Sequence, residues 1–139
     1  MLARDPVSGH YVNKARYPNA EETPSVLVLR STGAWVYFNG EQIRRRFLEL
    51  VEQAAAPVET VVIDCSTVPA IDITALASLR TFAGALKRRG IAVRLAELRD
   101  DVADFLRRRA AEADLGPIVA HRTVEQWVAA SGAAGRNTL

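Results

Sequence analysis

Two residues that could carry chemistry, Asp72 and Thr74, stand close together just after an apolar segment. They lie in Thr60–Leu76, which reads T-V-V-I-D-C-S-T-V-P-A-I-D-I-T-A-L. Asp72 is a favoured helix N-cap, because its carboxylate can accept free backbone N–H groups. A helix N-terminus also favours negative charge, so a phosphate on the Thr74 hydroxyl would be tolerated there. This spacing makes Thr74 a candidate phospho-acceptor.

A buried strand and a helix must position these two residues. The β-branched run Val61–Ile63 predicts a strand covered on both faces, as in a parallel sheet, and Pro69 ends the extended segment. After Asp72 the apolar residues recur at helical spacing, with Gly90 expected just past the helix end. The predicted inward face of this helix consists of Ile73, Leu76, Leu79, Ala83 and Leu86.

The preceding region predicts a hairpin and a helix. Val26–Arg30 has the composition of a strand, and Ala34–Phe38 would be the returning strand after a turn. Asn39 and Gln42 have capping-box spacing, which predicts a helix start at Asn39. The buried stripe of that helix would be Ile43, Phe47, Leu50, Val51 and Ala54.

The region after Gly90 predicts two further strands and two helices. Ile91–Ala96 and the weaker Pro117–Ala120 are the strand candidates. Asp100 or Asp101 could cap a short helix with Val102, Phe105 and Leu106 inward. Thr123 and Gln126 form a second capping box, opening a helix that would bury Val124, Trp127 and Val128. The order β-β-α-β-α-β-α-β-α predicts an α/β fold with a mixed, mostly parallel sheet of about five strands.

Composition and length predict one folded domain with flanking segments. The chain has 139 residues, of which 49% are hydrophobic, enough for a real core. We expect a linker or N-terminal arm over residues 1–24, which Pro6, Gly9, Pro18 and Pro24 punctuate, a domain over 25–131 and a flexible tail over 132–139. The net charge of +2 is too small to indicate nucleic-acid binding. No apolar run approaches the roughly 20 residues of a membrane span, so a soluble cytoplasmic domain is expected.

The usual signatures of enzymes, metal sites and cofactor sites are missing. His10 and His121, the only histidines, are far apart, and the chain has no Walker loop, G-x-G-x-x-G or G-x-S-x-G motif. Asp64 and Asp72 are better explained as a strand end and a helix cap than as catalytic carboxylates. The single Cys65 is expected to be a small core residue in a reducing compartment. We therefore expect no catalysis, no metal and no cofactor.

Three basic runs remain, at Arg44–Arg46, Lys87–Arg89 and Arg107–Arg109. Each lies on a predicted helix, and two lie near helix C-termini, where the dipole favours cations. They are interpreted first as solvated, helix-stabilising faces. The alternative is contact with anionic lipid headgroups or a nucleotide phosphate.

Five sequence segments follow one another along the chain: R-Y-P-N-A-E-E-T-P-S-V-L-V-L-R, Y-F-N-G-E-Q, V-P-A-I-D-I-T-A-L, R-D-D-V-A-D-F-L-R-R-R and I-V-A-H-R-T-V-E-Q-W-V. Together with the order of the elements, they resemble a STAS domain. This fold is shared by anti-sigma factor antagonists and the cytoplasmic C-terminus of SulP sulfate permeases, and the permease branch is the more similar. The resemblance covers about Tyr17 to Ala130.

The resemblance implies a switch at the start of the central helix. Thr74 falls where antagonists carry the phosphorylated Ser or Thr, and Asp72 matches the carboxylate two residues before it. The implied switch loop and partner surface comprises Asp72, Ile73, Ala75 and Leu76. Two departures argue against a kinase switch: Ala75 stands where antagonists commonly have Gly, and Ala110 where permeases often have Gly. The alternative for Thr74 is a helix-start residue whose hydroxyl bonds locally.

The resemblance implies a non-enzymatic regulatory and assembly module of a bacterial SulP-type anion (sulfate-like) transporter, at the cytoplasmic face of the inner membrane. Its implied partners are the transmembrane portion of the same polypeptide and a regulatory protein at Asp72–Leu76, with dimerisation through the parent transporter left open. The alternative is a free-standing anti-sigma factor antagonist switched by phosphorylation at Thr74; the long segment 1–24 favours the transporter. A third interpretation, nucleotide binding, depends on analogy and a helix N-terminus without a phosphate loop.

Overall fold

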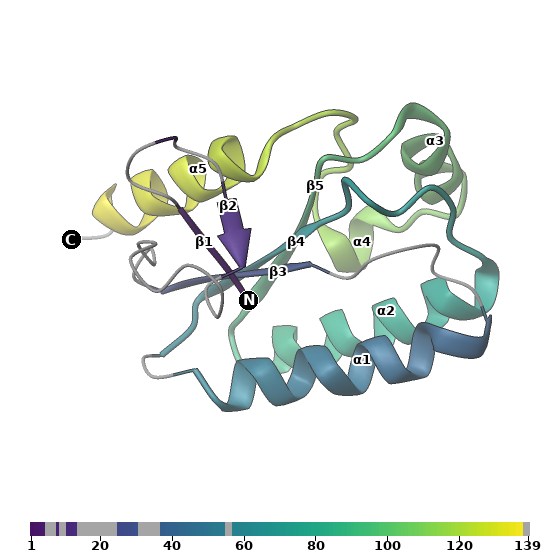
Figure 1. Ribbon diagram of the computed structural model, residues 1–139, viewed down its shortest axis with the longest axis horizontal. Coiled ribbons are helices and arrows are strands. Elements are labelled where there is room, and N and C mark those ends of the chain that lie inside the picture. Colours follow the sequence, from purple (N-terminus) through teal and green to yellow (C-terminus); the bar gives the residue numbers. More distant parts are fainter. Residues whose placement is uncertain (5–7, 9–10, 14–24, 31–36, 55–56, 138–139) are drawn as a thin grey trace.

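The chain folds around a mixed sheet with helices on both faces (Figure 1). The computed structural model describes residues 1–4, 8, 11–13, 25–30, 37–54 and 57–137. The strands are β1 (Leu2–Arg4), β2 (Tyr11–Asn13), β3 (Val26–Arg30), β4 (Thr60–Asp64) and β5 (Ala92–Ala96), ordered β2-β1-β3-β4-β5 across the sheet. β3, β4 and β5 run parallel, whereas β1 is antiparallel to β2 and β3. The predicted α/β fold, with a mixed sheet that is parallel in its core, is confirmed.

The helices form two layers. α1 (Tyr37–Glu52) and α2 (Ile73–Arg88) cover one face of the sheet, and α5 (Val124–Asn137) covers the other (Figure 1). α3 (Asp100–Arg108) and α4 (Glu112–Leu115) follow β5, and α4 contacts both β5 and α2. No helix in the described ranges is long and apolar enough to cross a membrane.

β4 is buried on both faces, as its β-branched run predicts. Val61, Val62 and Ile63 are all 0% exposed. Because side chains alternate along a strand, Val61 and Ile63 join the core under α1 and α2, while Val62 joins the core under α5. The predicted inward residues Leu76, Leu79, Ala83 and Leu86 of α2 are also buried.

Capping residues mark both ends of α2. Asp72 is the N-cap of α2, and Gly90 follows its C-cap with a φ of 76°. The N–H of Gly90 donates to the carbonyl of Lys87, and the N–H of Ile91 donates to the carbonyl of Leu86. These two hydrogen bonds together form a Schellman motif. Both predicted ends of this helix are confirmed.

The capping box of α5 is also present. The Thr123 N–H donates to Gln126 Oε1 at 2.9 Å, and the Gln126 N–H donates to Thr123 Oγ1 at 3.0 Å. The helix runs on to Asn137, into the segment expected to be a flexible tail. Val124, Trp127 and Val128 are buried, as predicted.

The N-terminal region differs from the surface arm that we expected over residues 1–24. Its described parts include β1 and β2, which extend the sheet beside β3. Leu2 and Ala3 are 6% and 1% exposed, so burial of these side chains accompanies the strand pairing. Strands of three residues are too short to show an alternating pattern in the sequence. The segment 14–24 lies outside the described residues.

Two predicted strands are not found as expected. Tyr37 and Phe38, the end of the predicted strand Ala34–Phe38, belong to α1, and residues 31–36 lie outside the described residues. The helix thus begins before Asn39, which is not its N-cap. The segment Pro117–Ala120 forms no strand, although Ile118 is buried. Ile118 packs into the core and Ala120 is partly buried against it, whereas Pro117 and Val119 are exposed.

Candidate functional site

The start of α2 has the geometry of a helix N-terminus at the carboxyl edge of a parallel sheet. The Asp72 carboxylate Oδ1 accepts the N–H of Ala75 at 2.7 Å, and its backbone carbonyl accepts the N–H of Leu76 at 2.9 Å. β4 lies between β3 and β5, so the loop from Asp64 to Asp72 emerges from an inner strand of the sheet.

Thr74 is exposed in the first turn of α2, as expected. Its hydroxyl has no hydrogen-bond partner among the described residues, whereas the Thr81 hydroxyl donates to the carbonyl of Ala77 at 3.0 Å. The local bonding proposed as the alternative is therefore seen at Thr81 and not at Thr74. A phosphate at Thr74 would lie in solvent near the positive end of the helix dipole.

The predicted partner surface is only partly at the surface. Ile73 was expected on the inward face but is 64% exposed, because it is the first residue of the helix and precedes the inward stripe. Ala75 and Leu76 are buried at 2% and 3% exposure, which corrects their assignment to a partner surface. What remains is the α2 start, meaning half-buried Asp72 with exposed Ile73 and Thr74.

The three basic runs have different surroundings. Arg107 donates to the carbonyl of Ile118 through Nε at 3.1 Å and Nη2 at 2.8 Å, and the guanidinium of Arg109 lies 3.9 Å from the Phe105 ring centroid. Arg107 and Arg109 therefore make contacts within the protein. Two members of the α1 run, Arg44 and Arg46, pair with nearby glutamates on the same helix. The exposed run Lys87–Arg89 at the end of α2 has no ion pair among the described residues.

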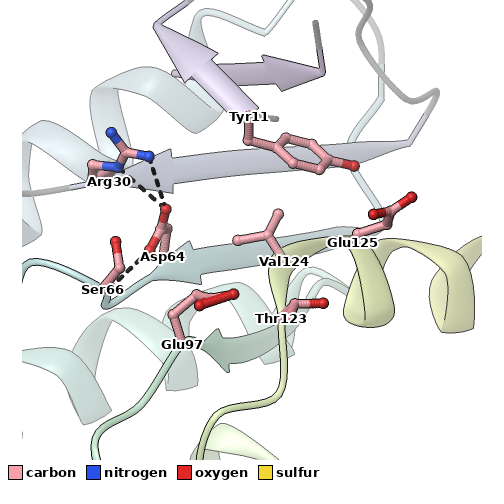
Figure 2. Close-up of a pocket in the computed structure, with 8 residues that line it drawn as sticks. All are labelled: Tyr11, Arg30, Asp64, Ser66, Glu97, Thr123, Val124 and Glu125. Atoms are coloured by element: carbon pink, nitrogen blue, oxygen red, sulfur yellow. Dashed lines mark hydrogen bonds and ion pairs between the residues drawn. The ribbon is translucent and has the colours of Figure 1, made fainter. Parts of the chain in front are cut away.

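A polar pocket of about 330 Å³ lies on the opposite face of the sheet from α2. Its walls come from β2, the ends of β3 and β4, the residue after β5, and the start of α5 (Figure 2). The lining residues are Tyr11, Arg30, Asp64, Ser66, Glu97, Thr123, Val124 and Glu125. The sequence alone did not predict this pocket. The available signal was that polar residues follow parallel strands whose carboxyl ends share one edge.

An ion pair forms one wall of this pocket. Arg30 and Asp64 are register partners on β3 and β4, and the Asp64 Oδ2 accepts from Arg30 Nε at 3.2 Å and Nη2 at 3.1 Å. Asp64 Oδ1 accepts the N–H of Ser66 at 2.8 Å. Asp64 is 3% exposed and is the one buried charged residue among those described. Its role is thus structural, in line with the interpretation of Asp64 as a strand end.

Metal and thiol chemistry find no support in the described residues. No group of three or more His, Cys, Asp or Glu side chains among them could hold a metal ion. Cys65 is buried and free, and burial together with the Asp64 charge raises the pKa of its thiol above the ordinary value. A thiol held in its neutral form is a poor nucleophile. His121 lies at the surface, with Nε2 3.0 Å from Asp100 Oδ2.

Known sequences similar to this chain are transporters. A probable sulfate transporter of Mycobacterium tuberculosis is 34% identical over 91 residues, which are 66% of this chain and 16% of the transporter. The chain therefore spans about a sixth of the length of that relative.

Solved structures show the same fold. The inward-facing murine Slc26a9 anion transporter matches with a TM-score of 0.84 at 18% identity, over 95% of this chain and 22% of the transporter chain. The STAS domain of a SulP transporter from Vibrio cholerae matches with a TM-score of 0.68 at 16% identity, over 88% of this chain and 93% of that domain. The model of the STAS domain family matches residues 17–125. The chain belongs to the STAS domain family.

Proposed function

We propose that this chain is the regulatory and assembly module of a SulP-type anion transporter, placed at the cytoplasmic face of the membrane and without catalytic activity. The observation that carries the proposal is the 34% identity, over 91 residues, to a probable sulfate transporter of which the chain spans 16%. The fold, which matches part of an anion transporter over 95% of the chain, is compatible with the same context. Its partner would then be the transmembrane portion of the transporter.

The α2 start offers the contact through which such a module would act. Ile73 is the most exposed large hydrophobic side chain among the described residues, and it adjoins exposed Thr74. An apolar side chain next to a modifiable hydroxyl suits a contact that charge can break. A phosphate on Thr74 would add about −1.5 to −2 charges at neutral pH, which the helix N-terminus tolerates and an apolar partner does not.

The exposed run Lys87–Arg89 supports a position close to a membrane. Each cation near an anionic leaflet contributes roughly 1 kcal/mol of attraction, which salt weakens. We expect the chain to bind vesicles containing anionic lipid and to release them as salt rises. The variant with Lys87, Arg88 and Arg89 all changed to Gln should bind less, and neutral vesicles should not bind.

Uptake of radiolabelled sulfate by the host tests the proposal directly. Deleting the chain should change the uptake, and restoring the wild-type chain should return it to the parental level. If uptake is unaffected by the deletion while other anions also enter at unchanged rates, the transporter assignment is wrong.

A second function, that of an antagonist switched by phosphorylation, is favoured by the exposed Thr74 hydroxyl, which has no hydrogen-bond partner among the described residues. In that case the chain should capture a serine kinase of the host. The Thr74→Glu variant should then no longer bind the kinase, although it stays folded. Capture of such a kinase, with no binding to anionic vesicles, would favour the antagonist over the transporter module.

A further inference from the structure

We propose that the pocket between β2, the strand ends and α5 binds a small organic cation, an amine or guanidinium compound. The pocket lies on the face of the sheet covered by α5, whereas the α2 start belongs to the helix layer on the other face (Figure 1). The proposal therefore goes beyond the regulatory role and does not depend on it.

The charges of the lining favour a cation. Arg30 is the one cationic side chain among the lining residues, and its Nε and Nη2 are already bonded to Asp64. Glu97 and Glu125 add two carboxylates that have no ion pair or side-chain hydrogen bond among the described residues. A ligand with positive charge would supply the partner that these two carboxylates lack.

The side chains around the pocket define a position for the positively charged group of the ligand. In Figure 2 the Tyr11 ring extends over the pocket from β2, with its hydroxyl end toward Glu125. Glu97 approaches from the opposite side, after β5, and Val124 lies between them (Figure 2). An alkylammonium or guanidinium group can donate hydrogen bonds to the carboxylates. It can also stack on the face of the neighbouring aromatic ring.

The size of the pocket agrees with a small ligand. The volume of about 330 Å³ is at the lower end of the range typical of small-molecule sites. Glu97 has a φ of 61°, a conformation that side-chain-bearing residues seldom adopt, and its N–H donates to the Arg122 carbonyl at 2.7 Å. That hydrogen bond fixes the backbone from which the Glu97 side chain projects at the pocket.

An anion fits the same pocket poorly. The start of α5 would attract negative charge, but its first turn already carries Glu125. The N–H of Gln126 is bonded to Thr123 Oγ1, and that of Trp127 to the Thr123 carbonyl. An anionic ligand would therefore meet three carboxylates and one guanidinium that is already paired.

Titration of the full chain with agmatine, followed by amide chemical shifts, tests the proposal. Agmatine carries a guanidinium and an ammonium, and 4-guanidinobutanoate of similar length replaces the ammonium by a carboxylate. We expect saturable shifts at the pocket residues with agmatine and much weaker ones with the butanoate. Glu97→Gln and Glu125→Gln should each weaken agmatine binding by about fivefold.

Glu59→Gln is the matched control, because it removes the same charge from an exposed residue at the other end of β4. It should leave agmatine binding unchanged, and Tyr11→Leu should weaken binding while Tyr11→Phe preserves it. The proposal is wrong if agmatine gives no saturable shift, or if the Glu97→Gln/Glu125→Gln double variant binds it as wild type does. Saturable binding of inorganic phosphate at the same residues would assign the pocket to anions and also overturn it.

Discussion

Arg30 and Asp64 form an ion pair at the carboxyl ends of two neighbouring parallel strands, with Nη2 of the guanidinium 3.1 Å from Oδ2 of the carboxylate. The two side chains differ in burial, since 34% of the Arg30 side chain is exposed and only 5% of the Asp64 side chain. The carboxylate thus depends on the guanidinium and on the Ser66 N–H for its hydrogen bonds. Loss of the cation would leave a buried negative charge.

The Arg30→Met variant should lower the free energy of unfolding by about 2 to 3 kcal/mol, because it leaves the buried Asp64 carboxylate without its cationic partner. The Arg30→Met/Asp64→Leu double variant should recover part of that loss, since an apolar pair carries no desolvation penalty. Urea unfolding of the wild type, both single variants and the double variant gives the coupling energy. A coupling near zero would mean that the pair contributes nothing to stability.

Leu79→Ala should destabilise the chain by about 2 to 5 kcal/mol, because it removes a side chain that is 5% exposed in the core. Ile73→Ala, on the same helix, is the matched control and should change stability by less than about 0.5 kcal/mol, because Ile73 is 64% exposed. Denaturant unfolding measures both. Equal losses for the two variants would contradict the orientation of α2.

Ala110→Gly should stabilise the chain by about 1 kcal/mol. Ala110 has a φ of 53°, and its N–H and that of Ala111 donate to the carbonyls of Arg107 and Leu106 at the end of α3. This left-handed position suits Gly, the residue that the family resemblance also implies there. Ala77→Gly in the exposed middle of α2 should instead destabilise by about 1 kcal/mol. Thermal unfolding should show the midpoint rising in the first variant and falling in the second.

Cys65 should make the fold sensitive to alkaline pH. Burial raises the pKa of its thiol above the ordinary value of 9.0. The stabilisation that the neutral thiol provides is therefore complete below pH 9.0 and declines as the pH rises above 9.0. The free energy of unfolding should fall by up to about 1.4 kcal/mol per pH unit above this point, relative to the Cys65→Ala variant. Urea titrations of both proteins from neutral pH to pH 10.5 provide the measurement. Parallel pH profiles would show that the thiol is accessible and titrates normally.

Elements with strong local signals could be predicted from the sequence. β4 has an unbroken β-branched run, α2 has an Asp at one end and a Gly at the other, and α5 has a complete capping box. Each of these signals acts within a few residues of its element, so pattern and structure agree. The exposure of Thr74 followed from the same local reasoning.

The features that depend on distant contacts could not be predicted. β1 and β2 are short strands, and Leu2 of β1 is buried because it packs in one core cluster with β3 and α5. The segment Pro117–Ala120 is apolar but does not pair as a strand. The burial of Ala75 depends on how α2 is rotated against the core, whereas the burial of Leu76 followed from the inward stripe of the helix. The pocket combines Tyr11 with residues more than a hundred positions later, so only the folded chain brings it together.

Sulfate uptake with variants at Thr74 tests the central claim most directly, which is that the α2 start regulates a SulP-type transporter. In a host lacking the chain, the wild type and Thr74→Ala should restore uptake, whereas Thr74→Glu should not, although it unfolds at the same temperature and accumulates to the same amount. The added charge would then act on a partner contact and not on the fold. Uptake that Thr74→Glu and the wild type restore equally would contradict the account.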